Sequence, residues 1–440
     1  MENVTSNTLH KEEGTTLERD PVKTVIFASM IGTAVEFFDF YAFGTASATY
    51  FPKIFFPTLT PTIAMMLSLL TFGVAFVARP LGSFIFGHFG DKIGRKKTLV
   101  VSLVLMGGST VMIGFLPGYS TLGFSAVLLL CLCRFIQGIG LGGEWSGAVL
   151  VATENAPEGK RALYGAFPEL GAPIGFILCN GLFYVLESFL SASQMASFGW
   201  RIPFLASSVM VFIGLWVRKR MQETPLFRKA QENSETTKSP LKEVFKTSWK
   251  QIIRGTFIVA VTYTLFFTLS TWSISYATTN LGFSNKEFLL ILMGSILVFT
   301  AMILISSYLA DFWGRKKMLM TTAALLVVFS FVFPYFLSGT HNVAGAIAFL
   351  VIGFFLMGII YGPMGALLPE LFSTKVRYSG SALAYNLAAI VGAAFAPTVA
   401  TWLAANWGIK YVGLYLGVMS VLSFVAFAFT KETKHVDYTE

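Results

Sequence analysis

Ionisable side chains stand inside the long apolar segments of this 440-residue sequence. A charge at the centre of a membrane-spanning helix costs about 2.5–3.5 kcal/mol on insertion scales, so such residues usually have a function. Glu36 and Asp39 lie three residues apart and would share one face of a helix. The other charges of this kind are Arg79, Arg134, Glu144 and Glu169, so all six lie in the first half of the chain. This set predicts chemistry that moves or neutralises charge within a membrane.

Asp39 and Arg134 both fall near the middle of their apolar segments. An aspartate beside an arginine stays ionised, whereas one that loses this partner in an apolar environment binds a proton. We therefore predict that Asp39 and Arg134 couple protonation to a conformational change, with Glu36 and Glu144 as further candidates. The alternative is a buried ion pair with a purely structural role.

Arg79 is a candidate for binding a carboxylate, because a guanidinium group matches carboxylate geometry with two parallel hydrogen bonds. Arg201 also has this chemistry, but it lies near a helix end, where an arginine reaches toward the membrane surface. In the second half, polar and aromatic residues are candidates for lining a pocket, although each also suits packing. These residues are Tyr263, Trp272, Tyr361, Tyr385 and Asn386.

The composition requires a non-aqueous environment for much of the surface. Hydrophobic residues make up 55% of the chain and charged residues 12%, about half the charged share of a soluble domain. The net charge of +9 comes from short basic runs between apolar segments, which argues against nucleic acid as a partner and for the lipid bilayer. The three cysteines lie in apolar segments and none of the four histidines is central to one, so we expect no disulfide framework, metal or haem.

Twelve apolar segments are long enough to cross a bilayer as helices, which takes about 20 residues each. They lie near 24–47, 62–86, 98–116, 121–148, 163–188, 200–217, 254–278, 288–310, 318–337, 343–367, 378–402 and 408–430. The predicted fold class is therefore an all-α membrane protein.

The Lys and Arg positions predict the orientation. If both termini are cytoplasmic, 26 of the 32 basic residues lie on the cytoplasmic side, as the positive-inside rule requires. The predicted organisation is a cytoplasmic tail (1–22), a six-helix bundle (23–217), a cytoplasmic linker (218–253), a second six-helix bundle (254–430) and a cytoplasmic C-terminal tail (431–440).

The two halves carry related loops. The loop after the second span reads GHFGDKIGRKK (87–97), and the loop after the eighth reads SYLADFWGRKK (307–317). A second pair of motifs follows the fourth and tenth spans, where an acid precedes an arginine by seven residues: Glu154 and Arg161, then Glu370 and Arg377. Such a duplication is typical of secondary transporters, which bind substrate between the halves and rock to alternate access.

These loops also predict a conformational latch. Gly87 and Gly94 permit a tight turn, and Asp91 would lie at a helix end beside Arg95, where an acid can bind a neighbouring helix terminus and hold one state. Asp311 and Arg315 repeat this pair 220 residues later. A solvated, positively charged loop is the alternative, but it does not explain the duplication.

At this point the sequence resembles a known family. GHFGDKIGRKK is similar to the loop signature of the major facilitator superfamily, and RFIQGIG (134–140) is similar to its fourth-helix motif. More narrowly, the chain resembles the metabolite:proton symporter family, which includes carriers of shikimate, α-ketoglutarate, citrate, and proline or betaine. The segments that carry this resemblance are GTAVEFFDFYAFG, ARPLGSFIFGHFGD, GLGGEW, GWRIPF and LLPELFSTKVRYSG.

The resemblance covers all twelve spans and implies two pseudo-symmetric six-helix bundles in the plasma (inner) membrane. It also supports the roles given to Asp39 and Arg134. We expect a monomeric symporter that takes up a small polar metabolite, such as shikimate or a di- or tricarboxylate, with the proton gradient in place of a cofactor. The alternative is a proton-coupled exporter of drugs or metabolites, because the run at 171–175 (GAPIG) is similar to a fifth-helix motif of drug:proton antiporters. We expect no enzyme, since no nucleophile–base set occurs.

Overall fold

A computed structural model describes residues 22–93, 95–142, 144–220, 240–374 and 376–436. All regular secondary structure in these ranges is helical. Side chains are described throughout except at 22–26, 28, 87–93, 95–99, 217–220, 240–243 and 245. The predicted all-α fold class is confirmed.

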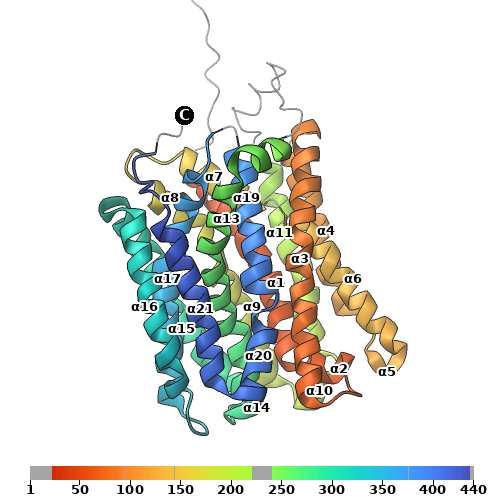
Figure 1. Cartoon of the computed structure of the whole chain (residues 1–440). Coiled ribbons are helices and arrows are strands. Elements are labelled where there is room, and N and C mark those ends of the chain that lie inside the picture. The colour runs from red at the N-terminus through yellow and green to blue at the C-terminus, as the bar shows by residue number, and fades with distance from the viewer. Residues whose placement is uncertain (1–21, 94, 143, 221–239, 375, 437–440) are drawn as a thin grey trace, which may run out of the picture.

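The first half supplies six spans, several of which are built from more than one helix (Figure 1). Its elements are α1 (Val22–Thr49), α2 (Phe51–Phe55), α3 (Pro61–Ile93), α4 (Arg95–Phe115), α5 (Tyr119–Leu122), α6 (Phe124–Gly140), α7 (Glu144–Glu154), α8 (Arg161–Glu169), α9 (Gly171–Phe189), α10 (Ala192–Ser197), η1 (Gly199–Arg201) and α11 (Ile202–Arg220). The spans are α1, α3, α4, α6 with α7, α8 with α9, and α11.

The second half repeats this arrangement. Its elements are α13 (Pro240–Phe267), η2 (Thr268–Trp272), α14 (Ser273–Asn280), α15 (Asn285–Trp313), α16 (Arg315–Phe336), α17 (Val343–Tyr361), α18 (Met364–Glu370), α19 (Arg377–Ala389), η3 (Ile390–Ala394), α20 (Ala396–Trp407) and α21 (Ile409–Ala428). Each of the twelve predicted apolar segments coincides with one of these spans.

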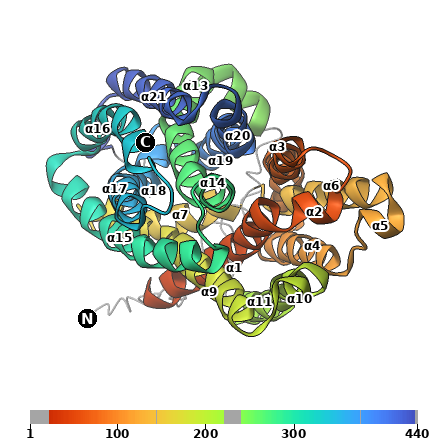
Figure 2. The same ribbon diagram turned by 90° about the horizontal axis from the view of Figure 1, so that it is seen from below.

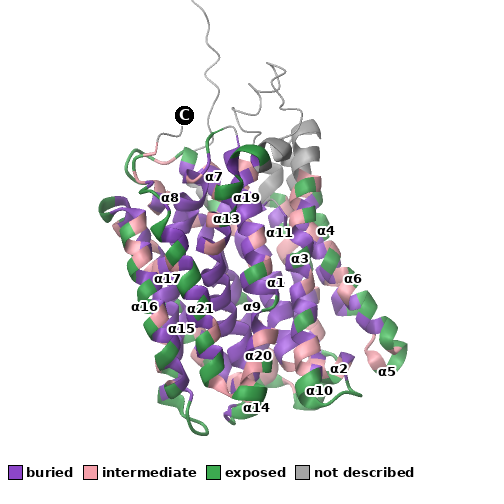
Figure 3. Cartoon of the chain, in the orientation of Figure 1, coloured by how far each residue is buried: buried purple, intermediate pink, exposed green. Residues whose placement is uncertain are grey.

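Apolar side chains on the circumference show that these helices suit a lipid environment. Within the described residues, ten helical stretches are long and apolar enough to cross a membrane, and Val100–Phe115 adds a shorter apolar helix. Large hydrophobic residues such as Phe115, Phe212 and Phe331 are exposed on the outer faces. Figure 3 shows exposed residues along the outer faces of the helices and buried residues between them.

The helices form two groups that lie side by side (Figure 2). In the first half, α1 packs on α9 and α11, and α6 packs on α3 and α4. In the second half, α13 packs on α19 and α21, and α15 packs on α17. The groups meet where α8 and α9 contact α15 and where α3 contacts α19, η3 and α20. We call the end that holds α7, α8 and the C-terminal segment the inner end, because the basic residues predict that it faces the cytoplasm.

Two spans of the second half contain π-helical turns. Thr268–Trp272 (η2) interrupts the seventh span, and Ile390–Ala394 (η3) interrupts the eleventh. Such turns are rare and often occur at functional sites, because the wider turn reorients the side chains around it. Helix α13 starts inside the predicted linker. Ser248 has non-helical backbone angles, and the resulting kink separates the first two turns of the helix from its spanning part.

Candidate functional site

A buried ion pair lies where the two halves meet. Glu36 of α1 is 1% exposed and Arg79 of α3 is 4% exposed, and their side chains form a salt bridge. Nη1 of Arg79 also donates a hydrogen bond of 3.3 Å to the hydroxyl of Tyr263, which belongs to α13 in the other half. One guanidinium group thus contacts an acid of the first half and a phenol of the second.

Aromatic residues from both halves surround this ion pair. The guanidinium carbon of Arg79 lies 5.1 Å from the centre of the Phe40 ring and 6.0 Å from that of Tyr385. The rings of Tyr385 and Tyr263 are 5.2 Å apart. The hydroxyl of Tyr361 lies close enough to that of Tyr385 to interact with it. Three of the predicted pocket residues, Tyr263, Tyr361 and Tyr385, are therefore brought together beside Arg79.

Trp145 completes this cluster, although its role was not predicted from the sequence. Its ring stacks on that of Tyr385 at 3.8 Å with an angle of 2° between the planes, so α7 of the first half contacts α19 of the second. The indole N–H of Trp145 is buried without a hydrogen-bond partner among the described residues. A buried donor without a partner loses free energy, so this N–H suits a polar atom of a bound ligand. The signal was present in the GLGGEW segment, where Trp145 follows Glu144, itself buried at the start of α7.

Asp39 and Arg134 are both fully buried, but they do not form an ion pair in the described structure. Asp39 accepts hydrogen bonds from the hydroxyls of Thr110 (2.9 Å) and Ser207, on α4 and α11. Arg134 donates to Gln137, and Nε2 of Gln137 donates to the Thr110 hydroxyl at 2.9 Å. A short polar chain therefore connects the two charges inside the first half. The coupling hypothesis has one state in which Asp39 and Arg134 form an ion pair. The described structure does not represent that state.

The remaining predicted pocket residues lie elsewhere. Trp272 is buried in η2, where its ring stacks on that of Tyr276 at 4.8 Å. Asn386 of α19 donates hydrogen bonds of 2.6 Å to the Ser83 hydroxyl and to the Gly142 carbonyl oxygen. Because both acceptors belong to the first half, Asn386 joins the halves.

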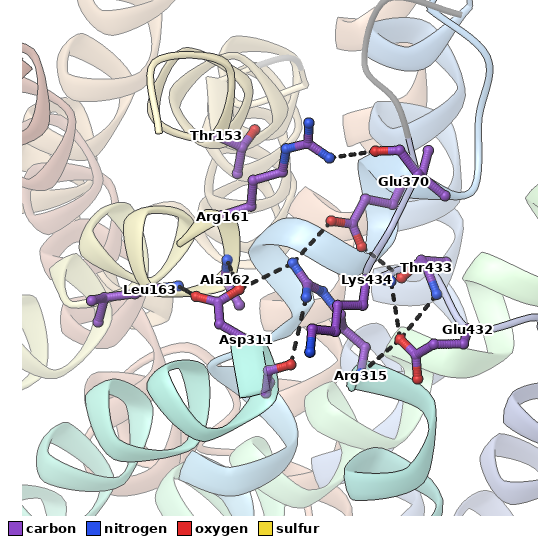
Figure 4. Close-up of polar contacts among 12 residues, drawn as sticks. Thr153, Arg161, Ala162, Leu163, Asp311, Arg315, Glu370, Glu432, Thr433 and Lys434 are labelled. Carbon is purple, nitrogen blue, oxygen red and sulfur yellow. Dashed lines mark hydrogen bonds and ion pairs between the residues drawn. The ribbon is translucent and has the colours of Figure 1, made fainter. Parts of the chain in front are cut away.

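The second copy of the repeated loop also joins the halves, at the inner end (Figure 4). Asp311, near the end of α15, accepts hydrogen bonds of 3.0 Å from the backbone N–H groups of Ala162 and Leu163 in the first turn of α8. Unpaired N–H groups and the helix dipole stabilise a carboxylate at such a position. Nη2 of Arg315 lies 3.2 Å from a carboxylate oxygen of Asp311 and 3.1 Å from one of Glu370. The predicted contact of an acid with a neighbouring helix terminus is present, and its role as a latch stays a prediction.

Part of the predicted latch cannot be compared with the structure. Gly94 and the side chains of Asp91 and Arg95 lie outside the described residues, and Gly87 falls in the same stretch at the end of α3. Glu154 is exposed at the end of α7. Arg377 is buried at the start of α19, where its Nε donates to the Phe372 carbonyl oxygen at 3.4 Å.

The C-terminal segment adds contacts that the sequence did not predict (Figure 4). Glu432 accepts hydrogen bonds of 2.9 and 3.1 Å from the backbone N–H groups of Arg315 and Lys316, which begin α16. The Thr433 hydroxyl donates to Glu370 at 2.6 Å. Arg161 of the first half donates to the Val436 carbonyl oxygen. The described part of the predicted cytoplasmic tail therefore packs against both halves.

The halves are also joined at the outer end. Glu187 of α9 accepts hydrogen bonds from the Tyr50 hydroxyl and from the side-chain amide of Asn285, the first residue of α15. The ammonium group of Lys286 lies 5.3 Å from the centre of the Tyr184 ring. We call Tyr50, Glu187 and Asn285 the outer joint. With contacts at both ends and at the centre, the structure represents a closed state.

The run at 171–175 serves helix packing in this structure. A Cβ atom on Gly171 would lie 2.0 Å from the Thr33 hydroxyl oxygen, and one on Gly175 would lie 2.7 Å from the Ala34 carbonyl oxygen. Only glycine lets α9 approach α1 so closely, as is usual for small residues between membrane helices. The feature that favoured an exporter therefore has a structural explanation.

Sequence comparisons identify close relatives over nearly the whole chain. The inner membrane metabolite transport protein YhjE of Escherichia coli strain K12 is 49% identical over 438 residues, which covers 98% of this chain and 99% of the relative. The shikimate transporter of the same strain is 32% identical, covering 96% and 97%. A proline/betaine transporter of that strain is also 32% identical, covering 95% of this chain and 85% of the relative.

Solved structures and a family model agree on the fold. The crystal structure of a D-xylose-proton symporter superposes with a TM-score of 0.73 at 18% identity, covering 95% of this chain and all of that one. A partially occluded, inward-open structure of the xylose transporter XylE from E. coli gives 0.74 at 18% identity, covering 94% and 98%. The family model described as Major Facilitator Superfamily matches residues 29–390. This chain is therefore a multi-pass membrane transporter, not an enzyme, and belongs to the Major Facilitator Superfamily.

Proposed function

We propose that this transporter is a proton-driven symporter that takes up a small carboxylic acid. The observation that carries the proposal is the Glu36–Arg79 ion pair, which lies buried between the halves among Tyr263, Tyr385 and Trp145. Arg79 offers the guanidinium group that a carboxylate needs, and the aromatic rings suit a compact ring or chain. Relatives named as metabolite and shikimate transporters support this substrate class.

Charge balance explains why a proton would travel with the substrate. In the closed state, the charges of Glu36 and Arg79 cancel. A substrate carboxylate that binds Arg79 displaces Glu36, and an ionised Glu36 left without its partner would cost several kcal/mol when the halves close. A proton on Glu36 restores neutrality. The halves can then close over substrate and proton together, or over neither, which is the condition for symport.

Asp39 and Arg134 support this exchange from inside the first half. Asp39 balances the buried charge of Arg134 through the Gln137–Thr110 chain, which leaves Glu36 free to respond to Arg79 alone. The two acids on α1 thus have separate roles. Glu36 takes the transported proton, and Asp39 stays ionised to balance the positive charge of Arg134.

Alternating access would open one end at a time. The inner end opens when Asp311 leaves the N-terminus of α8, and the outer end opens when Asn285 leaves Glu187. We place both termini in the cytoplasm from the charge distribution, with one chain sufficient for transport.

A transport assay tests this proposal. The purified protein is placed in liposomes with an acidic exterior, and uptake of labelled shikimate is compared with uptake at equal pH. We expect accumulation above the outside concentration only with the gradient, and none after a protonophore is added. A panel of di- and tricarboxylates and betaine defines the substrate. Extrusion of a cationic dye without uptake of any carboxylate would instead identify the proton-coupled exporter.

A further inference from the structure

Glu169 is a buried acid that the proposed exchange does not use. It ends α8, is 0% exposed, and both of its carboxylate oxygens lack a hydrogen-bond partner among the described residues. A facing donor is the backbone N–H of Gly365, in the first turn of α18, but this contact does not reach hydrogen-bond geometry. An ionised carboxylate in such a position would cost several kcal/mol. The group is therefore neutral while the halves are closed.

Glu169 lies at a place where the backbones of the two halves approach each other closely. A Cβ atom on Gly365 would lie 2.6 Å from the Gly165 carbonyl oxygen, so the backbones of α8 and α18 are in direct contact beside the acid. While α8 and α18 are in contact, Glu169 is fully buried. Separation at the inner end would hydrate Glu169 and permit it to ionise.

Three tyrosines lie near one another between the surroundings of Glu169 and the central ion pair. Tyr361 lies close enough to Glu169 and to Tyr385 to interact with both, and Tyr385 interacts in turn with Tyr263. Tyr263 accepts the hydrogen bond from Arg79. The acid thus lies at the inner end of a line of polar groups that begins at Glu36.

Other ionisable groups on the elements around Glu169 have partners of their own. Those with polar contacts are Glu36 on α1 with Arg79, Asp39 on α1 with Thr110 and Ser207, Asp311 on α15 and Glu370 on α18 with Arg315, Glu187 on α9 with Tyr50, and Glu144 and Glu154 on α7. Cys179 on α9 is a buried thiol. No cation faces Glu169 among the described residues.

We propose that Glu169 is the group that releases the transported proton at the inner end, neutral while α8 and α18 are in contact and ionised once they part. On opening, its O–H bond breaks and the proton passes to cytoplasmic water. The ionised acid then resists closure until it receives the proton held by Glu36, which leaves Glu36 ionised and able to pair with Arg79 again. This inference rests on the proposed proton symport, but its central step can be measured without substrate or gradient.

Spin-label distance measurements test this step on the full-length protein. Labels are attached to cysteines placed at Glu158 and Ser373, exposed positions at the inner end of each half, after replacement of Cys131, Cys133 and Cys179 by alanine. For the otherwise unchanged chain, we expect the long-distance, inner-open population to grow relative to the closed one by up to about tenfold per pH unit where Glu169 titrates, since one proton is linked to the opening. Glu169→Gln, which mimics the neutral acid, should stay closed and lose this dependence.

Two further variants keep the test decisive. Glu169→Asp retains an acid and should restore the pH dependence, whereas Glu287→Gln neutralises an exposed acid at the other end of the second half and should leave it unchanged. A Glu169→Gln protein that opens with rising pH like the parent overturns the proposal. Failure of proton-driven uptake in liposomes would instead count against the proposed function, so the two outcomes are distinguishable.

Discussion

At the residue scale, two acids of one helix have different partners. Glu36 and Asp39 are three residues apart, so their side chains leave α1 about 60° apart around its axis. That angle is enough to turn Glu36 toward Arg79 at the boundary of the halves and Asp39 toward Thr110 and Ser207 inside the first half. The sequence identified both acids, but their separate partners depend on the rotation of α1 within the bundle.

Neutralising either acid should uncouple transport from the proton. Glu36→Gln removes the group that we propose takes the transported proton. Asp39→Asn leaves Arg134 without its balancing charge, which favours an ionised Glu36. We expect both variants to lose gradient-driven accumulation yet retain exchange of labelled for unlabelled substrate in liposomes. Full uphill transport by Asp39→Asn would remove Asp39 from the mechanism, and the same result for Glu36→Gln would remove the proposed exchange at Arg79.

The indole of Trp145 should contribute a hydrogen bond to the substrate. Trp145→Phe keeps an aromatic ring against Tyr385 but removes the N–H, and the loss of one hydrogen bond of about 0.5–1.5 kcal/mol corresponds to a roughly two- to tenfold rise in KM. The measurement is the KM for exchange, with the melting temperature as a check on folding. Trp272→Phe is the matched control, since Trp272 also has a buried indole N–H without a partner but lies outside the cluster. A KM change in the control alone would place the substrate nearer η2.

At the element scale, two helix ends carry polar contacts at the inner end. The N-terminus of α8 is bound by Asp311 of the other half, and the N-terminus of α16 is bound by Glu432 of the C-terminal segment. A helix N-terminus presents up to four N–H groups without partners in the helix. One carboxylate can therefore accept several of these hydrogen bonds, and all of them are lost together when the carboxylate moves away. The duplicated motif predicted the first of these contacts, but the second depends on the path of the chain after α21.

Weakening the contact between Asp311 and α8 should favour the inner-open state. Asp311→Asn keeps an oxygen acceptor but loses the negative charge, and charge at a helix N-terminus is worth up to about 2 kcal/mol when partly buried. We expect the ratio of inner-open to closed protein to rise by up to about thirtyfold in the spin-label experiment. Glu287→Gln, an acid at the start of the same helix, is the control. An unchanged distance distribution in Asp311→Asn would show that Asp311 is not a latch.

At the scale of the whole molecule, the sequence predicted the twelve spans because hydrophobic length and the distribution of Lys and Arg are local properties. It also identified Tyr263, Tyr361 and Tyr385, which the structure gathers around Arg79. It did not predict the stacking of Trp145 on Tyr385 or the outer joint, because both join residues more than 90 positions apart in different halves. Contacts of that kind depend on how the two bundles are placed together.

The anchored C-terminal segment has a practical consequence for handling the protein. Glu432, Thr433 and Val436 contact α16, Glu370 and Arg161, so a bulky reporter or affinity tag attached directly behind them would pull on the junction that must open and close. Functional work is better done with a cleavable tag at the opposite terminus. A fluorescent protein fused after Val436 would give the correct amount of expressed protein, but the transport rate measured with it would differ from that of the unfused chain.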